Sequence, residues 1–375
     1  MQTLPPLLKL PPATVSGRCT VDKLPEYGRR FGPRGMLVHG KSLATNPVGK
    51  KLLKAFAPEN NVCIWQHSGG EPTLQQLDDL LAFARAEKPD WIAGIGGGSV
   101  LDLAKAAAGL LYAPGTTLEY HDGFPLPAGC RTAPFIAVPT TAGTGSEATA
   151  VCVITNEDSG VKKSFRDDKF IARIIVLDAN LLDHCPPPVI AAAGMDAFVQ
   201  AVESFISRNA TDFTTDLSLR AAKLIKNALT EAFAGATGQP RENLLYGSYL
   251  AGIALANARL GLVHGLAHPL GARYHLPHGQ ACALCLPAVL KFNRPAVPEK
   301  FAQLEQQLEC NLDQLTAEWL TAFNFSNPFS DPRPVFDRTA IIAEILASGS
   351  TAANPRTVSA RDAAAVLDQI GRPAG

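Results

Sequence analysis

The stretch "WIAGIGGGSVLDLAK", residues 91–105, joins an apolar run to a helix-forming run through three glycines. The apolar run Trp91–Ile95 has the length and composition of a buried strand. Glycines let a diphosphate approach the backbone, and the free N–H groups and positive dipole end of the next helix favour an anion. We expect Ser99 to cap that helix. The stretch matches neither GxGxxG nor the P-loop. Its three glycines before a helix predict phosphate binding, and a tight strand-to-helix turn is the alternative.

A second glycine-rich loop, "PTTAGTGSEAT" at residues 139–149, also follows an apolar strand-like run. Its hydroxyl donors are Thr140, Thr141, Thr144, Ser146 and Thr149. Loops that follow parallel strands meet at the carboxyl edge of a sheet, where open α/β sheets bind ligands. The two loops together predict a dinucleotide site.

Strand-like and helical runs alternate through the first half of the chain. Besides the two glycine-rich segments, the strand-like runs are "RGMLVHG", "NVCIW", "ATAVCVIT" and "ARIIVLD". A helical run with leucines at helical spacing begins at Leu74 and is closed by Pro89. This order predicts a mostly parallel sheet wrapped by helices.

Three consecutive prolines, Pro186 to Pro188, mark a change of pattern and are interpreted as a connector. Beyond them the chain is predicted to be helical almost throughout. We therefore expect two domains: an α/β dinucleotide-binding domain over residues 1–183 and a helical metal and substrate domain over residues 184–375.

Composition limits the class of partner. Of the 375 residues 46% are hydrophobic and 18% charged, and Lys+Arg equals Asp+Glu at 34, so the formal net charge is zero. A chain without basic excess is not expected to bind nucleic acid or an anionic membrane. Prolines interrupt the apolar start "MQTLPPLLKLPP", and no later apolar stretch of membrane-span length lacks charges, Gly or Pro. We expect a soluble, cytoplasmic protein that acts on a small molecule.

The eight cysteines lie mostly in apolar contexts, which predicts reduced, buried thiols. Cys282 and Cys285 form a CxxC within "ACALCLP". Because no second CxxC exists to complete a structural site, this segment is interpreted as one apolar helical turn.

Half of the chain's eight histidines lie in "HGLAHPLGARYHLPHGQ", residues 264–280. Upstream, "GMDAFVQAVES" places Asp196 and Gln200 four residues apart, on one face of a helix. Asp196, His264 and His278 are candidates to converge on a divalent cation, and their oxygen and imidazole donors suit Zn or Fe. The alternative is that these histidines are hydrogen-bonded core or cap residues.

Five segments in order carry a resemblance to a known family: "GGGSVLDLAK", "PTTAGTGSEAT", "VKKSF", "GMDAFVQAVES" and "GLVHGLAHPLGARYHLPHGQACALCLP". The chain resembles the iron-containing (group III) alcohol dehydrogenases, which are related to dehydroquinate synthase and glycerol dehydrogenase. The resemblance implies a Rossmann-like α/β domain, an all-helical domain and an active site in the cleft between them. It also implies a homodimer, or a larger oligomer built from dimers.

The resemblance also implies roles for individual residues. In the family an Asp, a His four residues later and two more histidines hold a divalent metal, often iron and sometimes zinc. The matching positions here are Asp196, Gln200, His264 and His278, and His268 matches a histidine beside the substrate that relays a proton. The pyrophosphate cradle corresponds to Gly96, Gly97, Gly98 and Ser99. The cofactor groove corresponds to Asp102, Thr140, Thr141, Thr144, Thr149 and Lys162.

This sequence departs from the family pattern at two places. Gln200 replaces a ligand histidine, and a neutral amide oxygen is a poorer ligand than imidazole for first-row transition metals. After the strand-like "MLVH", Gly40 and Lys41 stand where NAD-preferring members carry an Asp for the adenosine ribose. An Asp would repel a 2′-phosphate, whereas Gly with a neighbouring cation favours one, so NADP is expected over NAD.

The predicted reaction is reversible hydride transfer between NAD(P)(H) and a small alcohol, aldehyde or ketone, assisted by iron or zinc. One alternative is a metal-independent reductase in which His264, His268 and His278 donate hydrogen bonds to the oxyanion. A second is a lyase like dehydroquinate synthase, which shows no net redox change. A third is a dinucleotide sensor without catalysis.

Overall fold

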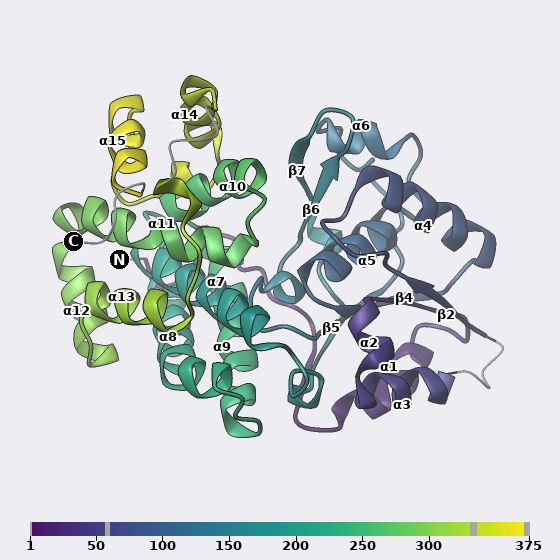
Figure 1. Ribbon diagram of the computed structural model, residues 1–375. Helices are drawn as coiled ribbons and strands as arrows, with labels where there is room; N and C mark the ends of the chain where they lie inside the picture. The colour runs from purple at the N-terminus through teal and green to yellow at the C-terminus, as the bar shows by residue number, and fades with distance from the viewer. Residues whose placement is uncertain (1, 57–60, 331–335, 371–375) are drawn as a thin grey trace. The chain divides into compact units, whose positions relative to one another are not determined.

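The computed structural model describes residues 2–56, 61–330 and 336–370 (Figure 1). These residues form two compact units. One unit runs from Lys9 to Cys185, and the other contains the residues up to Leu8 together with those from Pro186 onward.

The first residues of the chain pack with the helical unit, although the sequence predicted them in the α/β domain. The backbone N–H of Asp212 donates to the carbonyl of Gln2 at 3.0 Å, and that of Phe213 donates to Thr3 at 3.1 Å. These bonds use N–H groups at the start of a helix, which have no partner within the helix itself. The first residues therefore belong to the helical unit, and the domain ranges 1–183 and 184–375 stay an interpretation of the sequence.

The first unit contains a six-stranded, all-parallel sheet, as predicted. In spatial order its strands are β1 (Thr14–Ser16), β8 (Ile174–Leu177), β5 (Phe135–Pro139), β4 (Trp91–Gly96), β2 (Gly35–His39) and β3 (Val62–Gln66). The four strands β2, β4, β5 and β8 are buried at every position, as expected of a sheet covered on both faces.

The helices of this unit lie on both sides of the sheet. They are α1 (Leu24–Arg29), α2 (Lys41–Thr45), α3 (Pro47–Phe56), α4 (Leu74–Glu87), α5 (Gly98–Leu110) and α6 (Thr117–His121). Figure 1 shows α4 and α5 on one side of the strands and α1 and α3 on the other. Helix α4 begins with a capping box at Thr73 and Gln76, which satisfies two of its free N–H groups.

The segment "ATAVCVIT" is a strand, as predicted, but it does not join the parallel sheet. It forms β6 (Val151–Asn156), which pairs antiparallel with β7 (Val161–Arg166) in a separate two-stranded sheet. Asn156 accepts the backbone N–H groups of Asp158 and Ser159, and Gly160 has a φ of 68°. A turn this short returns the chain antiparallel at once, so no crossover helix is available to continue the parallel order.

The second unit is helical, as predicted. Its helices are α7 (Pro187–Ile206), α8 (Asp212–Phe233), α9 (Gln239–Ala258), α10 (Leu262–Tyr274), α11 (His278–Asn293), α12 (Pro298–Leu308), α13 (Leu312–Ala322), α14 (Arg338–Ala347) and α15 (Ala360–Ile370). The three prolines are not merely a connector, because Pro187 and Pro188 form the first turn of α7. Proline is favoured there because the first N–H groups of a helix have no acceptor within it.

Helix α7 is the core of this unit. It packs against α8, α9 and α11. Among the described residues it is the one unbroken helix long and apolar enough to cross a membrane, but 83% of its apolar stretch is buried. A second apolar segment, α9 followed by α10, bends by 106° at the break. The burial of α7 identifies it as the central helix of a globular bundle.

Lys105 on α5 connects this helix to the loop that follows β5. Its ammonium is completely buried and donates to the carbonyls of Ser146 (2.7 Å) and Val151 (2.6 Å) and to the hydroxyl of Ser146 (2.8 Å). Asp102, one turn earlier, accepts from the Ser146 hydroxyl and from the backbone N–H of Val153. A buried charge needs such partners, so this network holds the loop on α5.

We expect Lys105→Met to lower the free energy of unfolding by about 3 kcal/mol, because it leaves Asp102 and two carbonyls buried without their cation. Urea denaturation followed by fluorescence measures the change. Lys50→Met, at an exposed position of α3, is the matched control and should be close to neutral. Equal stability of the two variants would contradict a structural role for Lys105.

Candidate active site

The two glycine-rich loops lie together at the carboxyl edge of the parallel sheet, as expected. Strands β4 and β5 are adjacent and parallel, with Gly96 opposite Pro139. The backbone N–H of Thr140 donates to the carbonyl of Gly96 at 2.9 Å. The start of α5 and the threonine-rich loop are therefore parts of one surface.

The glycines at the start of α5 allow the threonine-rich loop to pack closely against this helix. A Cβ on Gly98 would lie 2.6 Å from Cγ2 of Thr144, and one on Gly97 would lie 3.3 Å from Oγ1 of Thr141. The expected cap at Ser99 is wrong, because α5 begins at Gly98 and Gly97 is its N-cap without a side-chain hydrogen bond. The chain reaches helical geometry before Ser99, which leaves the first N–H groups of α5 available to an anion.

The other predicted cofactor residues of this unit differ in burial and in contacts. Asp102 and Thr149 belong to the buried Lys105 network, where burial raises the pKa of Asp102 despite the opposing charge of Lys105. Thr140 is also buried, whereas Thr141 and Thr144 are more accessible. Lys162 on β7 forms an ion pair with Glu71 at 2.8 Å. Asp102 and Thr149 therefore hold the loop through the Lys105 network, whereas Thr141 and Thr144 are accessible side chains of the loop.

Gly40 and Lys41 lie at the same edge of the sheet, where β2 ends. The N–H of Gly40 donates to the carbonyl of Ile95 on the neighbouring strand, and Gly40 is the N-cap of α2. A Cβ on Gly40 would lie 3.3 Å from Cγ2 of Val100 on α5. Lys41 is exposed. The structure therefore places both residues beside the glycine loop.

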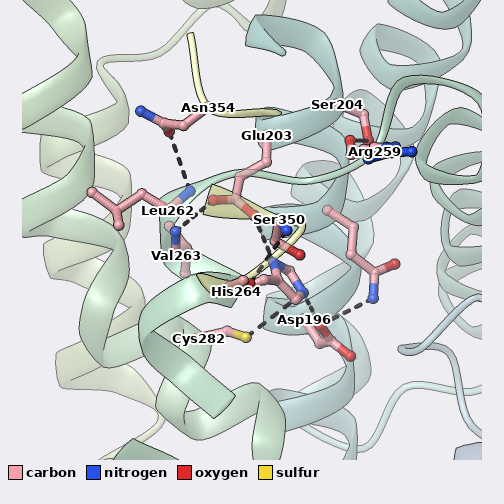
Figure 2. Close-up of polar contacts among 12 residues, drawn as sticks. Asp196, Glu203, Ser204, Arg259, Leu262, Val263, His264, Cys282, Ser350 and Asn354 are labelled. Carbon is pink, nitrogen blue, oxygen red and sulfur yellow. Dashed lines mark hydrogen bonds and ion pairs between the residues drawn. The ribbon is translucent and has the colours of Figure 1, made fainter. Parts of the chain in front are cut away.

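In the helical unit, Asp196, His264 and His278 come together from three helices, α7, α10 and α11. Nε2 of His264 lies 3.2 Å from Oδ1 of Asp196, and Nε2 of His278 lies 3.8 Å from the same oxygen. Asp196 and His264 are almost fully buried, and His278 is partly exposed. Figure 2 shows the Asp196 and His264 side chains pointing toward each other.

A glycine allows this convergence. A Cβ on Gly279, the second residue of α11, would lie 1.9 Å from the carbonyl oxygen of Ala192 on α7. Any larger residue would push the two helices apart. Because His278 precedes this contact and Asp196 lies one turn beyond Ala192, the contact sets the separation of the two side chains.

Glu203 fixes the orientation of His264, and sequence reasoning missed it. Its Oε2 lies 2.6 Å from Nδ1 of His264, and its Oε1 accepts the backbone N–H of Val263 at 2.6 Å (Figure 2). A carboxylate only accepts, so Nδ1 carries the proton and Nε2 can face a metal with its lone pair. The available signal was its spacing, seven residues after Asp196 on the same face of α7.

Gln200 contacts Asp196 directly. Its Nε2 donates to Oδ1 of Asp196 at 3.0 Å, within one turn of α7. The Gln200 side chain, predicted as a metal ligand, thus presents its amide N–H group to Asp196. This contact orients the Asp196 carboxylate.

Cys282 lies in the same cluster, although its CxxC forms the buried helical turn that was predicted. Its Sγ lies 3.8 Å from Nε2 of His264 and 3.7 Å from Nε2 of His278. The donor atoms of Asp196, His264, His278 and Cys282 all lie within 4.8 Å of one another. The missed signal was the four-residue spacing from His278, which puts both side chains on one face of α11.

The groups of the cluster are electrostatically coupled. Burial acts to raise the pKa of Asp196, but the imidazoles of His278 and His264 lower it below its usual value. Burial acts to lower the pKa of His264, but Cys282 and Asp196 raise it well above its usual value. Buried acidic groups around a common point favour a cation there.

His268 lies beside this cluster on α10, one turn after His264. Its ring stacks on that of His278 with centroids 5.0 Å apart, and the side chain is exposed. His275, the fourth histidine of the segment, ends α10 in a left-handed conformation and is also exposed. Three of the four histidines are thus brought together.

Comparisons with known proteins agree with this arrangement. The family model "Iron-containing alcohol dehydrogenase" matches residues 11–179, and "Fe-containing alcohol dehydrogenase family, C-terminal" matches residues 190–324. The chain is 37% identical over 314 residues to "Probable alcohol dehydrogenase EutG" of Salmonella typhimurium, covering 80% of this chain and 76% of the relative. It is 33% identical over 308 residues to lactaldehyde reductase of Escherichia coli, covering 80% and 79%.

A solved structure extends the match to nearly the whole chain. A crystal structure of a 1,3-propanediol oxidoreductase superposes with a TM-score of 0.89 at 30% identity, covering 97% of this chain and 99% of that one. These relatives are oxidoreductases, so the lyase alternative is not favoured. The chain belongs to the iron-containing alcohol dehydrogenase family and is an oxidoreductase of alcohols and aldehydes.

Proposed function

We propose that the chain transfers a hydride reversibly between NAD(P)(H) and a small aldehyde or ketone, with a divalent metal held by the cluster around Asp196. The observation that supports this most directly is the convergence of Asp196, His264 and His278 from three helices, with the His264 tautomer fixed by Glu203. Oxygen and imidazole donors with a carboxylate behind one imidazole suit iron or zinc.

The chain's own residues divide the work of such a reaction. The start of α5 and the accessible threonines would hold the cofactor diphosphate. The bound nicotinamide would supply the hydride chemistry. A metal on the cluster would act as a Lewis acid toward the carbonyl oxygen. His268 is exposed beside His278 and would deliver the proton that the product alkoxide needs.

Assembly and location remain proposals. We propose a homodimer, or an oligomer built from dimers, from the family resemblance, and a cytoplasmic location from the composition of the chain. The placement of the active site between the two domains also stays a prediction.

The decisive experiment combines metal content with turnover. Protein purified without chelators or a metal-affinity step should contain close to one iron or zinc per chain by mass spectrometry and should oxidise NADPH with propanal. We expect His264→Ala to lose the metal and to lower kcat/KM by roughly 100-fold or more, since even outer-shell partners of a metal matter 10–100-fold.

His275→Asn is the matched control, because Asn tolerates the left-handed conformation of His275, which lies outside the cluster. It should keep both metal and turnover. Turnover without metal would indicate the metal-independent reductase. Metal binding without any NAD(P)H turnover would overturn the proposed function.

Cofactor choice is tested at Gly40. We expect wild-type enzyme to prefer NADPH, and Gly40→Asp to lower the ratio of kcat/KM for NADPH over NADH by about tenfold, or about 1.4 kcal/mol, through repulsion of the 2′-phosphate. Gly40→Ala adds the same Cβ beside Val100 without the charge and should leave the ratio unchanged. A wild-type preference for NADH would contradict the assignment.

Glu203 is tested through metal affinity. Glu203→Gln keeps the shape of the side chain but allows its NH₂ group to donate to Nδ1 of His264, which places the imidazole proton on Nε2. We expect zinc affinity, measured by competition with a chelator, to fall by about 10–100-fold. Glu231→Gln, at an exposed position of α8, should not change it. Unchanged affinity in Glu203→Gln would show that the tautomer of His264 does not depend on this contact.

A further inference from the structure

We propose that Cys282 supplies a thiolate ligand in place of the histidine that is absent at Gln200, so that the metal site is Asp196, His264, His278 and Cys282 and favours zinc over iron. The proposal rests on the metal site of the proposed function and specifies its fourth ligand. It assigns to α11 a ligand that the family pattern draws from α7.

The distances fit a tetrahedral thiolate site. Zinc bonds of about 2.3 Å to sulfur and about 2.0 Å to nitrogen, at tetrahedral angles, place those two atoms about 3.5 Å apart. Sγ of Cys282 lies 3.8 Å and 3.7 Å from Nε2 of His264 and His278. The two imidazole nitrogens lie 3.2 Å and 3.8 Å from Oδ1 of Asp196. The four donors therefore need only small shifts to share one ion.

Gln200 has a different function in this arrangement. Its amide nitrogen donates to Oδ1 of Asp196 at 3.0 Å, which orients the carboxylate toward the imidazoles. As a metal ligand, the neutral amide oxygen of Gln200 is weaker than the carboxylate, the imidazoles and the thiolate, and the thiolate also adds a negative charge. Gln200 is therefore assigned as a positioning residue and Cys282 as the ligand.

Cys282 is distinguished from its neighbour Cys285 by its position on α11. Both thiols are completely buried. Cys282 lies one turn after His278 and faces the cluster. Among the described residues, the cluster of possible metal ligands consists of Asp196, His264, His278 and Cys282 and does not include Cys285. Two equally buried cysteines on one helix, one inside the cluster and one outside it, provide a matched pair for experiment.

The ligand change has a consequence for the metal. Thiolates favour zinc among the divalent ions commonly bound with imidazole and carboxylate, and zinc also binds more tightly than ferrous iron to most mixed sites. Binding displaces the Cys282 thiol proton to solvent. We expect the protein, equilibrated with equal free zinc and ferrous iron under anaerobic conditions, to retain zinc.

Cobalt substitution tests the ligand directly. Full-length protein stripped with a chelator and loaded with Co²⁺ should show a near-ultraviolet thiolate-to-cobalt charge-transfer band, which carboxylate and imidazole ligands do not produce. Cys282→Ala should abolish this band and weaken zinc binding by roughly 100-fold, whereas Cys285→Ala should keep both. Circular dichroism establishes that each variant is folded.

A double variant separates loss of a ligand from loss of packing. Gln200→His in the Cys282→Ala background restores an imidazole at the family position, so zinc affinity should recover without the charge-transfer band. A variant that binds poorly only because its core is damaged would not recover. Cobalt bound to the wild type without the band, or a band that persists in Cys282→Ala, would overturn the proposal.

Turnover on the same preparations distinguishes this proposal from the proposed function. Turnover of NADPH with propanal in a protein whose cobalt form lacks the band would retain the function and reject Cys282 as a ligand. A band without turnover by the zinc protein would retain the ligand and reject the function.

Discussion

The approach of α11 to α7 at Gly279 is the contact on which the helical site depends. Gly279 allows the backbone of α11 to contact the carbonyl oxygen of Ala192, where a Cβ atom would overlap that oxygen. His278 and Cys282 are thereby presented to Asp196, and Glu203 on the same face of α7 holds His264 from the other side. A cation site built from three helices requires such fixed separations, because metal–ligand bonds tolerate errors of only a few tenths of an ångström.

Much of the fold was predictable because its signals are local. Apolar runs followed by glycine turns predicted β4 and β5, and the parallel order placed their loops together without knowledge of any contact. The failures arose where a few residues decide between geometries. The turn at Asn156–Gly160 makes β6 and β7 a hairpin. Pro187 is the first residue of α7, whereas the sequence had predicted that all three prolines form a connector.

The site was predictable in its residue types but not in its contacts. Spacing on one helix indicated Asp196 with Gln200, and the density of histidines indicated His264 and His278. The sequence did not predict Glu203 and Cys282 as site residues, because their roles depend on contacts with His264 on another helix. Spacing within one helix does not reveal such contacts. Likewise Asp102 matched a cofactor position, yet the structure shows it bound into the network of Lys105.

The candidate metal site and the candidate cofactor loops belong to different compact units. All four donors of the metal-type cluster lie beyond Pro186, whereas the glycine and threonine loops lie before Cys185. A metal bound by the four donors would stabilise the helical unit by mass action, and a diphosphate bound by the loops would stabilise the α/β unit. A substitution among the four donors would therefore act first on the stability of the helical unit, and one in the glycine loop on that of the α/β unit.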